Sequence, residues 1–261
     1  MLHPADLAEV TERFGVAAEQ VRRDHLVAHL LSALATCAVG DLALIGGTGL
    51  AYTHLRGGRV SEDVDLLVDP WSPVAEWIRD AVPQLLRREY PDLRWDPDPT
   101  QVRRQGSARL MATTGEVVRV QLIAWEGDWR RYPTELMSLE ARYRDVAPTW
   151  LRVPTPAAFA VMKASAWCDR HAARDLFDLA GLAELGAVDP LAQTIAADAL
   201  GRPIRGHDFR CRPPADWSLQ LAHQTSHLPD PVAMMAAVGQ VWEAAWIMAD
   251  RAPSESDSER Q

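Results

Sequence analysis

The pair of aspartates in the stretch SEDVDLLV is the strongest sign of chemistry in this sequence. Asp63 and Asp65 are two positions apart, so on a strand their side chains point to the same face. The apolar neighbours Val64 and Leu66 indicate a mostly buried strand, where two unpaired carboxylates are costly. A divalent ion such as Mg²⁺, which is held by one or two carboxylates together with substrate phosphates, removes that cost. The pair therefore predicts a metal site.

Two glycines precede the aspartates in the order that a phosphate-binding turn requires. Gly46 and Gly47 follow the apolar run LALI and lead into a short predicted helix, GLAYTHL, which Thr48 is placed to cap. Glycine lets backbone approach a ligand closely, and a helix N-terminus presents free N–H groups to an anion. The structural alternative is a tight turn followed by aspartates that cap a turn or pair with Arg56 and Arg59.

A second polar cluster surrounds the lysine of the chain. The 27 basic residues are 26 arginines and one lysine, Lys163. Lysine is a compact point charge on a flexible stem, whereas arginine is a planar fork of five donors. Lys163 is followed by Arg170, Arg174, Asp175 and Asp178, and on a helix the last three share a face.

These two clusters together resemble a known enzyme family. The stretch IGGTGLAYTHLRGGRVSEDVDLLV is similar to the signature of the DNA polymerase β-like nucleotidyltransferase superfamily. Its RxSxDxD form, made by Arg59, Ser61, Asp63 and Asp65, resembles the AbiEii/AbiGii toxin family. That family has a K-x6-R-x3-RDxxDL helix pair in its second half, and the residues from Lys163 onward match its spacing.

The resemblance implies both a fold and an activity. The fold is α+β, with a small mixed sheet flanked by helices in a nucleotidyltransferase-like N-terminal half, followed by a helical C-terminal half. The activity is transfer of a nucleoside monophosphate from an NTP to an acceptor hydroxyl, with Mg²⁺ or Mn²⁺ as cofactor and the 3′ end of a tRNA as acceptor. The protein would be the toxin of a bacterial toxin–antitoxin system, with a cognate antitoxin encoded nearby.

The resemblance also implies a role for each matching residue. The metal ligands would be Asp63 and Asp65. The NTP-binding residues would be Gly46, Gly47, Thr48, Arg59, Ser61, Lys163, Arg170 and Arg174. The catalytic residues would be Asp63, Asp65, Lys163, Asp175 and Asp178. Lys163 would face the β- and γ-phosphates, and the division of roles between Asp175 and Asp178 is open.

One expected residue is different here. The superfamily commonly carries a third carboxylate on a later strand, and the best later strand, VVRVQLIAW, has Gln121 in its place. Glutamine cannot act as a base, so the attacking hydroxyl would be activated by Glu116, by Glu126, by one of the helical aspartates, or by metal and positioning alone. This departure motivates one alternative function, a degenerate protein that binds an NTP or a partner without catalysis.

The charge of the chain bears on the acceptor. A net charge of −9 argues against broad nucleic-acid binding and favours, as another alternative, a cationic small molecule such as an aminoglycoside, beside a protein hydroxyl. Two stretches are nevertheless basic islands, residues 103–131 and 202–212. Their arginines are Arg103, Arg104, Arg109, Arg119, Arg130, Arg131, Arg202, Arg205, Arg210 and Arg212.

The elements that must position these residues follow from apolar periodicity and breakers. Helix is predicted over 5–38 with a break at Gly15, over 73–90 with a disturbance at Pro83, and at 156–170, 172–185, 189–199, 215–226 and 231–250. Strands are predicted at LALI, DVDLLV, 92–96, 101–105, 108–113 and 116–125, and a loop at 201–216. We expect a nucleotidyltransferase-like domain over 1–150, a helical domain that completes the active site over 151–250, and a disordered tail over 251–261.

Other residues bear on metal binding and on the cellular compartment. His25 and His29 are four apart on a predicted helix, but no third ligand is visible, so we interpret them as a solvated face. Cys37, Cys168 and Cys211 fit neither a metal motif nor a disulfide framework and favour a reduced cytoplasm. We find no transmembrane run or signal peptide in the sequence, expect no membrane partner, and make no prediction of the oligomeric state.

Overall fold

The computed structural model describes residues 1–102, 106–226 and 228–251. They fall into two compact units, the first formed by Met1–Thr155 with Ser218–Leu228 and the second by Pro156–Trp217 with Pro229–Gln261. The predicted strand at 101–105 and the predicted tail lie largely outside the described residues, as do Arg103 and Arg104, while Gln101 is in a turn.

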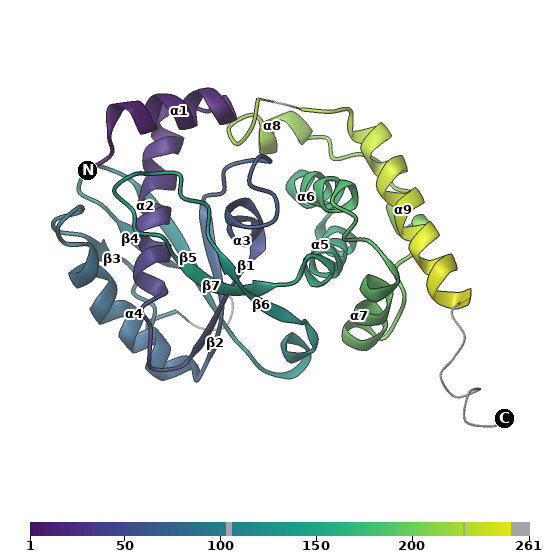
Figure 1. Ribbon diagram of the computed structural model, residues 1–261, viewed down its shortest axis with the longest axis horizontal. Helices are drawn as coiled ribbons and strands as arrows, with labels where there is room; N and C mark the ends of the chain where they lie inside the picture. Colours follow the sequence, from purple (N-terminus) through teal and green to yellow (C-terminus); the bar gives the residue numbers. More distant parts are fainter. Residues whose placement is uncertain (103–105, 227, 252–261) are drawn as a thin grey trace. The chain divides into compact units, whose positions relative to one another are not determined.

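A seven-stranded mixed sheet forms the centre of the first unit (Figure 1). Its strands follow the order β3-β4-β5-β2-β1-β7-β6. They are β1 (Asp41–Ile45), β2 (Asp63–Asp69), β3 (Arg94–Trp95), β4 (Ala108–Met111), β5 (Val117–Ala124), β6 (Thr134–Ser138) and β7 (Trp150–Pro154). The central strand β2 pairs with β1 antiparallel and with β5 in parallel.

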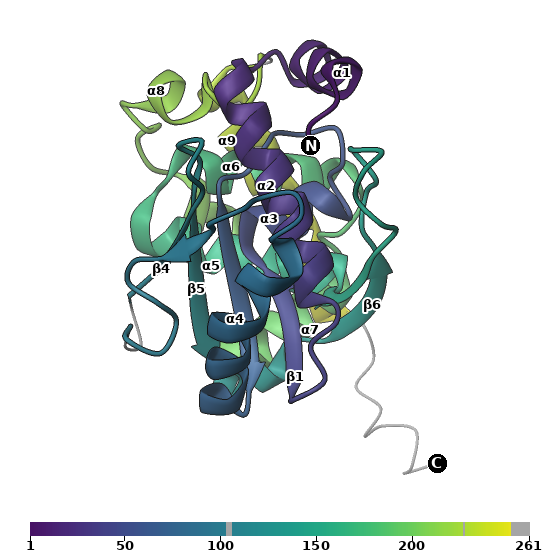
Figure 2. The ribbon, with the colours of Figure 1, turned by 90° about the vertical axis from the view of Figure 1, so that its left-hand side faces the viewer.

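Four helices and a 3₁₀ turn accompany this sheet along the first stretch of chain. They are α1 (Pro4–Phe14), α2 (Ala18–Leu34), α3 (Gly46–Tyr52), α4 (Trp71–Leu86) and η1 (Gly127–Arg131). Helices α2 and α4 lie across one face of the strands, where both contact β5 (Figure 2). That face is apolar because Val64, Leu66, Val118 and Val120 point toward it and are fully buried. The alternate residues of β2 and β5 carry the polar groups on the opposite face.

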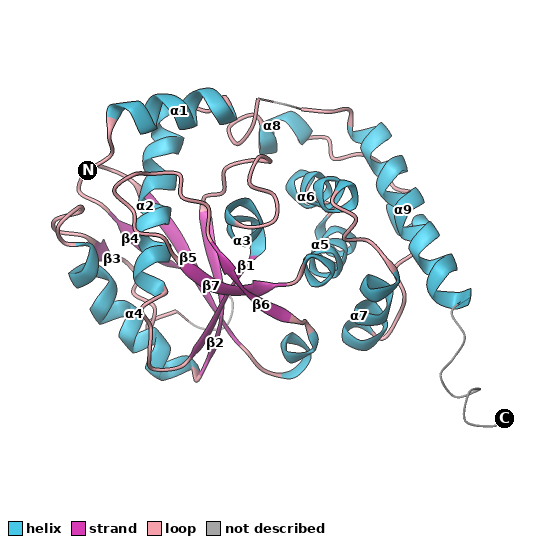
Figure 3. Ribbon diagram, in the orientation of Figure 1, coloured by secondary structure: helices cyan, strands magenta, loops and turns pink. Residues whose placement is uncertain are grey.

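The second unit is helical among the described residues (Figure 3). It contains α5 (Pro156–Arg170), α6 (Ala173–Glu184), α7 (Pro190–Leu200), η2 (Gly206–Phe209) and α9 (Pro231–Arg251), and the short helix α8 (Trp217–Leu221) begins at its edge. Helix α5 packs on α6 and α7, and α9 packs on α6, α7 and η2. This architecture confirms the predicted fold class, a mixed sheet with helices followed by a helical half.

Helix α9 departs from our expectation about apolar segments. Its 21 residues are long and apolar enough to cross a membrane by length and composition, and 28% of its most apolar window is buried. Core helices of water-soluble proteins meet the same criterion, so this feature alone assigns no membrane partner.

Several element boundaries differ from the predictions. The strands β6 and β7, which pair with each other antiparallel, were not predicted. The short helix after β1 starts at Gly46 instead of Gly49, with Ile45 as its N-cap, so Thr48 is not the cap that we expected. The helix predicted at 215–226 is only the five-residue α8, and the loop predicted at 201–216 contains η2.

Candidate active site

The junction of β1 and α3 brings a glycine directly against a carboxylate of the predicted pair. Register pairs Ile45 of β1 with Asp65 of β2, and the next residue, Gly46, turns the chain with a φ of +71°. A Cβ atom at Gly46 would lie 2.5 Å from Oδ2 of Asp65. Both the left-handed φ and this close approach require glycine here. The backbone therefore places the glycine turn directly against Asp65 of the carboxylate pair.

The second glycine contacts the arginine and serine of the RxSxDxD stretch. A Cβ at Gly47 would lie 2.6 Å from Nη2 of Arg59 and 3.0 Å from Oγ of Ser61. Arg59 is buried and donates from Nη1 to Oε1 of Gln224 at 2.7 Å, while Gln224 accepts from the backbone N–H of Val60 through its carbonyl. The guanidinium is thus held in place by a segment that lies 165 residues away in the chain.

Thr48 has a different position from the one its predicted NTP-binding role suggests. Its side chain is fully buried, and its hydroxyl donates to the backbone carbonyl of Asp63. The hydroxyl therefore ties α3 to the start of β2 instead of pointing toward a ligand. A contact of Thr48 with an NTP would have to come from its backbone N–H.

An arginine that we did not single out as a site residue contacts the first aspartate. Asp63 is the register partner of Arg119 on β5. Nε of Arg119 lies 2.8 Å from Oδ1 of Asp63, and Nη2 lies 3.1 Å from Oδ2, which is a bidentate pair. The hydrogen bonds that Arg119 donates to the Asp63 carboxylate raise the pKa of Arg119. The register that aligns VRVQ of β5 with DVD of β2 would have identified Arg119, but a single sequence does not show which strands pair.

Gln121 occupies the place beside Asp65 where the superfamily commonly carries a carboxylate. The two residues are register partners on β5 and β2. Glu126 follows the other end of β5, five residues from Gln121, or about 16 Å along an extended strand. Glu116 lies instead beside Tyr90, whose pKa is raised by burial and then by the Glu116 carboxylate. The strand next to the aspartates thus offers an amide in place of a base.

A row of charged side chains continues from Asp63 toward the edge of the sheet. Asp63 on β2 pairs in register with Arg119 on β5, which pairs with Arg109 on β4. Register partners share a face of the sheet, so the three side chains are neighbours on the polar face. The side chains of Arg109 and Arg119 are 48% and 58% exposed. These two half-exposed guanidinium groups, here called the positive strip, lie beside the carboxylate pair, and each has a carboxylate partner, Asp63 for Arg119 and Asp96 for Arg109.

In the second unit, Lys163 lies between two aspartates of the next helix. Its Nζ is 3.2 Å from Oδ1 of Asp175 and 2.7 Å from Oδ2 of Asp178. Lys163 is on α5 and the aspartates are on α6, and all three residues are buried. A compact ammonium can contact both carboxylates at once, whereas the flat arginine fork matches one carboxylate.

The two helical aspartates differ in their partners. Asp175 is completely buried and also accepts a bidentate pair from Arg170, with distances of 2.7 and 2.9 Å. Burial acts to raise the pKa of Asp175, but Arg170 and Lys163 outweigh it and lower that pKa. Asp175 therefore holds Arg170 and Lys163 at the α5–α6 hairpin.

The residues at the start of β2 fit a hard divalent cation. Asp63 and Asp65 place two carboxylates on one face, Gly46 adds no side chain next to the Asp65 carboxylate at the β1–α3 turn, and both oxygens of Asp63 also accept from Arg119. Two carboxylates with substrate phosphates are a sufficient donor set for Mg²⁺. Because α3 has only seven residues, the contribution of its dipole is small, and Gly46 and Gly47 would serve a phosphate mainly through backbone access.

Comparisons with known proteins agree with the sequence motifs. The family model "Nucleotidyl transferase AbiEii toxin, Type IV TA system" matches residues 30–249. The fold is similar to that of MenT4, a nucleotidyltransferase toxin from Mycobacterium tuberculosis H37Rv, with a TM-score of 0.68 and 23% identity over 99% of this chain and 93% of that one. It is also similar to a putative nucleotidyltransferase from H. pylori, with a TM-score of 0.53 and 15% identity over 92% of this chain and 100% of that one. No curated protein matches this chain.

Proposed function

The chain belongs to the AbiEii family of nucleotidyltransferase toxins of type IV toxin–antitoxin systems, and on that premise we propose that it transfers a nucleoside monophosphate from an NTP to a hydroxyl of RNA, with the 3′ end of a tRNA as acceptor. The observation that carries the proposal is the pair of carboxylates at the start of β2, which lies against the glycine turn of β1 and beside a positive strip.

The carboxylate pair supports use of a divalent cation. Asp63 and Asp65 would hold Mg²⁺ or Mn²⁺, which when bound neutralises charge on the phosphates. Gly47 and the backbone around it give the triphosphate close access. The buried guanidinium of Arg59, which Gln224 fixes in position, adds a positive charge beside Gly47. These residues perform the two tasks on which phosphoryl-type transfer depends, positioning and charge neutralisation.

The absence of a base beside Asp65 restricts how the acceptor is activated. Gln121 can orient a hydroxyl by hydrogen bonding but cannot remove its proton. Glu116 precedes β5 and Glu126 follows it, so neither is on the strand beside Asp65. We therefore assign activation of the acceptor hydroxyl to its positioning and to the bound divalent cation, because β5 carries no carboxylate that could act as the base.

The positive strip favours RNA over a cationic small molecule as acceptor. Arg109 and Arg119 point to the same face as Asp63 and are about half exposed. Arginines of this kind attract a phosphate backbone and repel an aminoglycoside. The protein hydroxyl, the remaining alternative, has no feature of the described residues in its favour.

The setting of the activity follows from the family. A toxin of a type IV system has a cognate antitoxin, and a nucleotidyltransferase uses an NTP. We propose that the chain acts in the cytoplasm, which the three free cysteines support.

The test of the proposed function is a labelling experiment. The protein is incubated with each α-labelled NTP, Mg²⁺ and total cellular RNA, with metabolite and protein fractions run beside it. We expect label in the tRNA fraction, and none when the tRNA has a blocked 3′ hydroxyl. Label that appears instead in the metabolite or protein fraction would overturn the acceptor, and no label in any fraction would overturn the transfer.

A further inference from the structure

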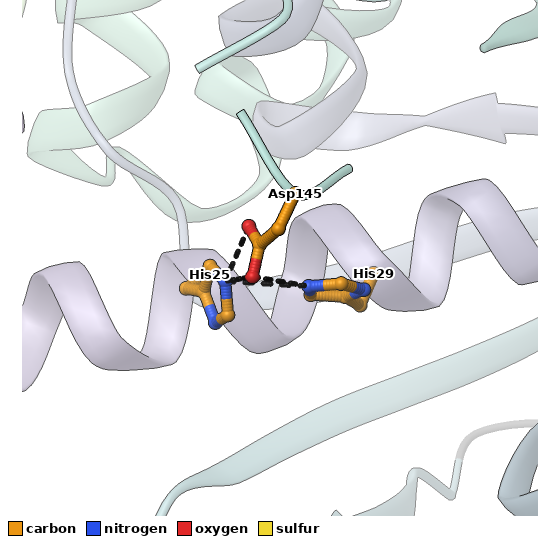
Figure 4. A group of neighbouring side chains, drawn as sticks. All are labelled: His25, His29 and Asp145. Atoms are coloured by element: carbon orange, nitrogen blue, oxygen red, sulfur yellow. Dashed lines mark hydrogen bonds and ion pairs between the residues drawn. The ribbon is translucent and has the colours of Figure 1, made fainter. Parts of the chain in front are cut away.

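A buried group of two histidines and one aspartate lies in the first unit, on α2 and the loop between β6 and β7. His25 and His29 are one helical turn apart, and Asp145 points at both of them (Figure 4). Nε2 of His25 is 3.1 Å from Oδ1 of Asp145 and 3.2 Å from Nε2 of His29, and Nε2 of His29 is 3.7 Å from Oδ2 of Asp145. Our interpretation of the histidines as a solvated face is wrong, because they are only 2% and 8% exposed.

These distances match the edges of a metal coordination shell. In a four-coordinate zinc site with metal–ligand distances of about 2.0–2.1 Å, neighbouring ligand atoms lie about 3.3–3.4 Å apart. Among Nε2 of His25, Nε2 of His29 and Oδ2 of Asp145, the three distances are 3.2, 3.2 and 3.7 Å. The ligand atoms are therefore already spaced to receive one ion, without a large movement of α2 or of the loop.

The proton count of the group also favours a cation. Nε2 of His25 lies 3.2 Å from Nε2 of His29, and it is also 3.1 Å from Oδ1 and 3.2 Å from Oδ2 of Asp145. Nδ1 of His25 lies 2.6 Å from the hydroxyl of Tyr90. One N–H on Nε2 of His25 can be directed at only one of these neighbouring atoms. A positive ion among the three atoms satisfies all of them at once.

Surrounding contacts fix both sides of the group. The Tyr90 hydroxyl orients the His25 ring from its far nitrogen, which is the outer-shell contact that metal-bound histidines usually make. The residues before Asp145 are anchored to α2, because Nη1 of Arg142 lies 3.0 Å from Oδ1 of Asp24 and the Tyr143 hydroxyl donates to Oδ2 of Asp24 at 2.7 Å. The loop therefore presents Asp145 from a rigid base.

We propose that His25, His29 and Asp145 bind one Zn²⁺ ion, which cross-links α2 to the loop before β7. Two imidazole nitrogens and one carboxylate are a typical zinc donor set, and three protein ligands leave the fourth position to water. Nitrogen ligands disfavour Mg²⁺, so this site differs in chemistry from the carboxylate pair on β2. The Met1 amino group lies 2.9 Å from Oδ2 of Asp145 and also contacts Glu89. Oδ2 is also the oxygen that lies 3.2 Å from Nε2 of His25 and 3.7 Å from Nε2 of His29, so a Zn²⁺ ion bound through Oδ2 would displace the amine or share that oxygen with it.

The test measures metal binding directly. Chelator-treated protein is titrated with Zn²⁺ by calorimetry and, separately, with Co²⁺, whose visible absorption bands become intense in a four-coordinate site. We expect one Zn²⁺ per chain, a four-coordinate Co²⁺ spectrum, and a higher Tm when Zn²⁺ is added. His29→Gln and Asp145→Asn should each weaken Zn²⁺ binding by more than about 100-fold, because loss of an outer-shell contact alone costs about 10–100-fold.

Matched controls separate this site from other histidines and from the nucleotidyltransfer site. His207→Gln changes a histidine whose side chain is 66% exposed and should leave Zn²⁺ binding unchanged. Asp65→Asn should keep Zn²⁺ binding as well. The proposal is overturned if the unaltered protein binds no stoichiometric Zn²⁺, or if His29→Gln and Asp145→Asn both bind it as tightly. Circular dichroism shows whether each variant is folded. If His29→Gln does not fold, Asp145→Asn decides the result, because Asp145 is partly exposed.

Discussion

At the scale of single residues, Arg119 changes the expected electrostatics of the carboxylate pair. Two same-face carboxylates repel, and the sequence suggested a metal, or pairing with Arg56 and Arg59, as the compensating charge. The bidentate contact of Arg119 with Asp63 provides a protein cation next to the same site. Asp65 instead lies against the glycine turn and beside an amide. The two aspartates therefore have different surroundings, although their spacing made them look equivalent.

The aspartate pair gives the first prediction. Asp65→Asn keeps the size of the side chain but removes the charge that would hold a divalent cation, so we expect the rate of nucleotidyl transfer to fall by about 100-fold or more. Asp69→Asn is the matched control, since Asp69 is on the same strand and pairs with Arg130 at its other end. Transfer of an α-labelled nucleotide measures both. Full activity in Asp65→Asn would refute the site assignment.

Lys163 gives a prediction about the geometry of the charged group. In Lys163→Arg the charge is kept, but a planar guanidinium cannot replace one ammonium between Asp175 and Asp178. We expect loss of most of the transfer activity and a lower Tm. Lys163→Met should lower the free energy of unfolding by about 3–5 kcal/mol, because it leaves buried carboxylates without their partner.

The control for this prediction exchanges the same two residue types at an exposed position. The side chain of Arg88 is 93% exposed, so Arg88→Lys should alter neither activity nor Tm. If Lys163→Arg behaves like Arg88→Lys, the point charge is not needed. Thermal denaturation and the labelling assay together distinguish a loss of stability from a loss of function.

At the scale of elements, the β1–α3 turn is defined by contacts that only glycine permits. Gly46→Ala would put a Cβ 2.5 Å from Oδ2 of Asp65 at a φ of +71°, so the turn or the carboxylate must move. We expect Gly46→Ala to abolish nucleotidyl transfer and to lower the Tm. Gly57→Ala is the control, because a Cβ there meets no atom within 4 Å. Equal activity of the two variants would show that the close approach has no function.

The elements that the sequence failed to predict have weak local signals. The edge strands β6 and β7 are five residues each and pair with each other. In β7, exposed Trp150 and Arg152 alternate with buried Leu151 and Val153. The pattern covers too few residues to be distinguished from chance alternation in the sequence. Helix α3 starts three residues early because tertiary contacts hold GGTG, a poor helix former, in place. One of those contacts is the bond from Thr48 to the carbonyl of Asp63.

At the scale of the whole molecule, a local group of basic side chains contrasts with the negative net charge of the chain. The chain has a net charge of −9, yet Arg109 and Arg119 lie side by side on the polar face of the sheet. A local strip of this kind can bind a phosphate backbone while the acidic remainder limits nonspecific binding. Net charge by itself therefore does not decide between an RNA acceptor and a cationic one.

The strip gives the last prediction. Arg109→Gln should weaken tRNA binding and reduce the slope of log K against log salt concentration by about one, as expected for one lost phosphate contact. Arg152→Gln is the control, since Arg152 is an exposed arginine on β7, on the other side of β2 in the strand order. Electrophoretic mobility shifts at several salt concentrations measure both. An unchanged slope in Arg109→Gln would argue against the strip as an RNA contact.

The sequence by itself determined the features that depend on local spacing. The two-residue period placed Asp63 and Asp65 on one face, the glycines marked the turn after β1, and the helix pair from Lys163 followed from its periodicity and the family spacing. Only tertiary structure decided the features that depend on distant partners. These include Arg119 beside Asp63, Gln224 on Arg59, and Asp145 facing His25 and His29. The physical reason is that periodicity fixes the direction of a side chain, whereas strand register and loop closure choose its neighbour.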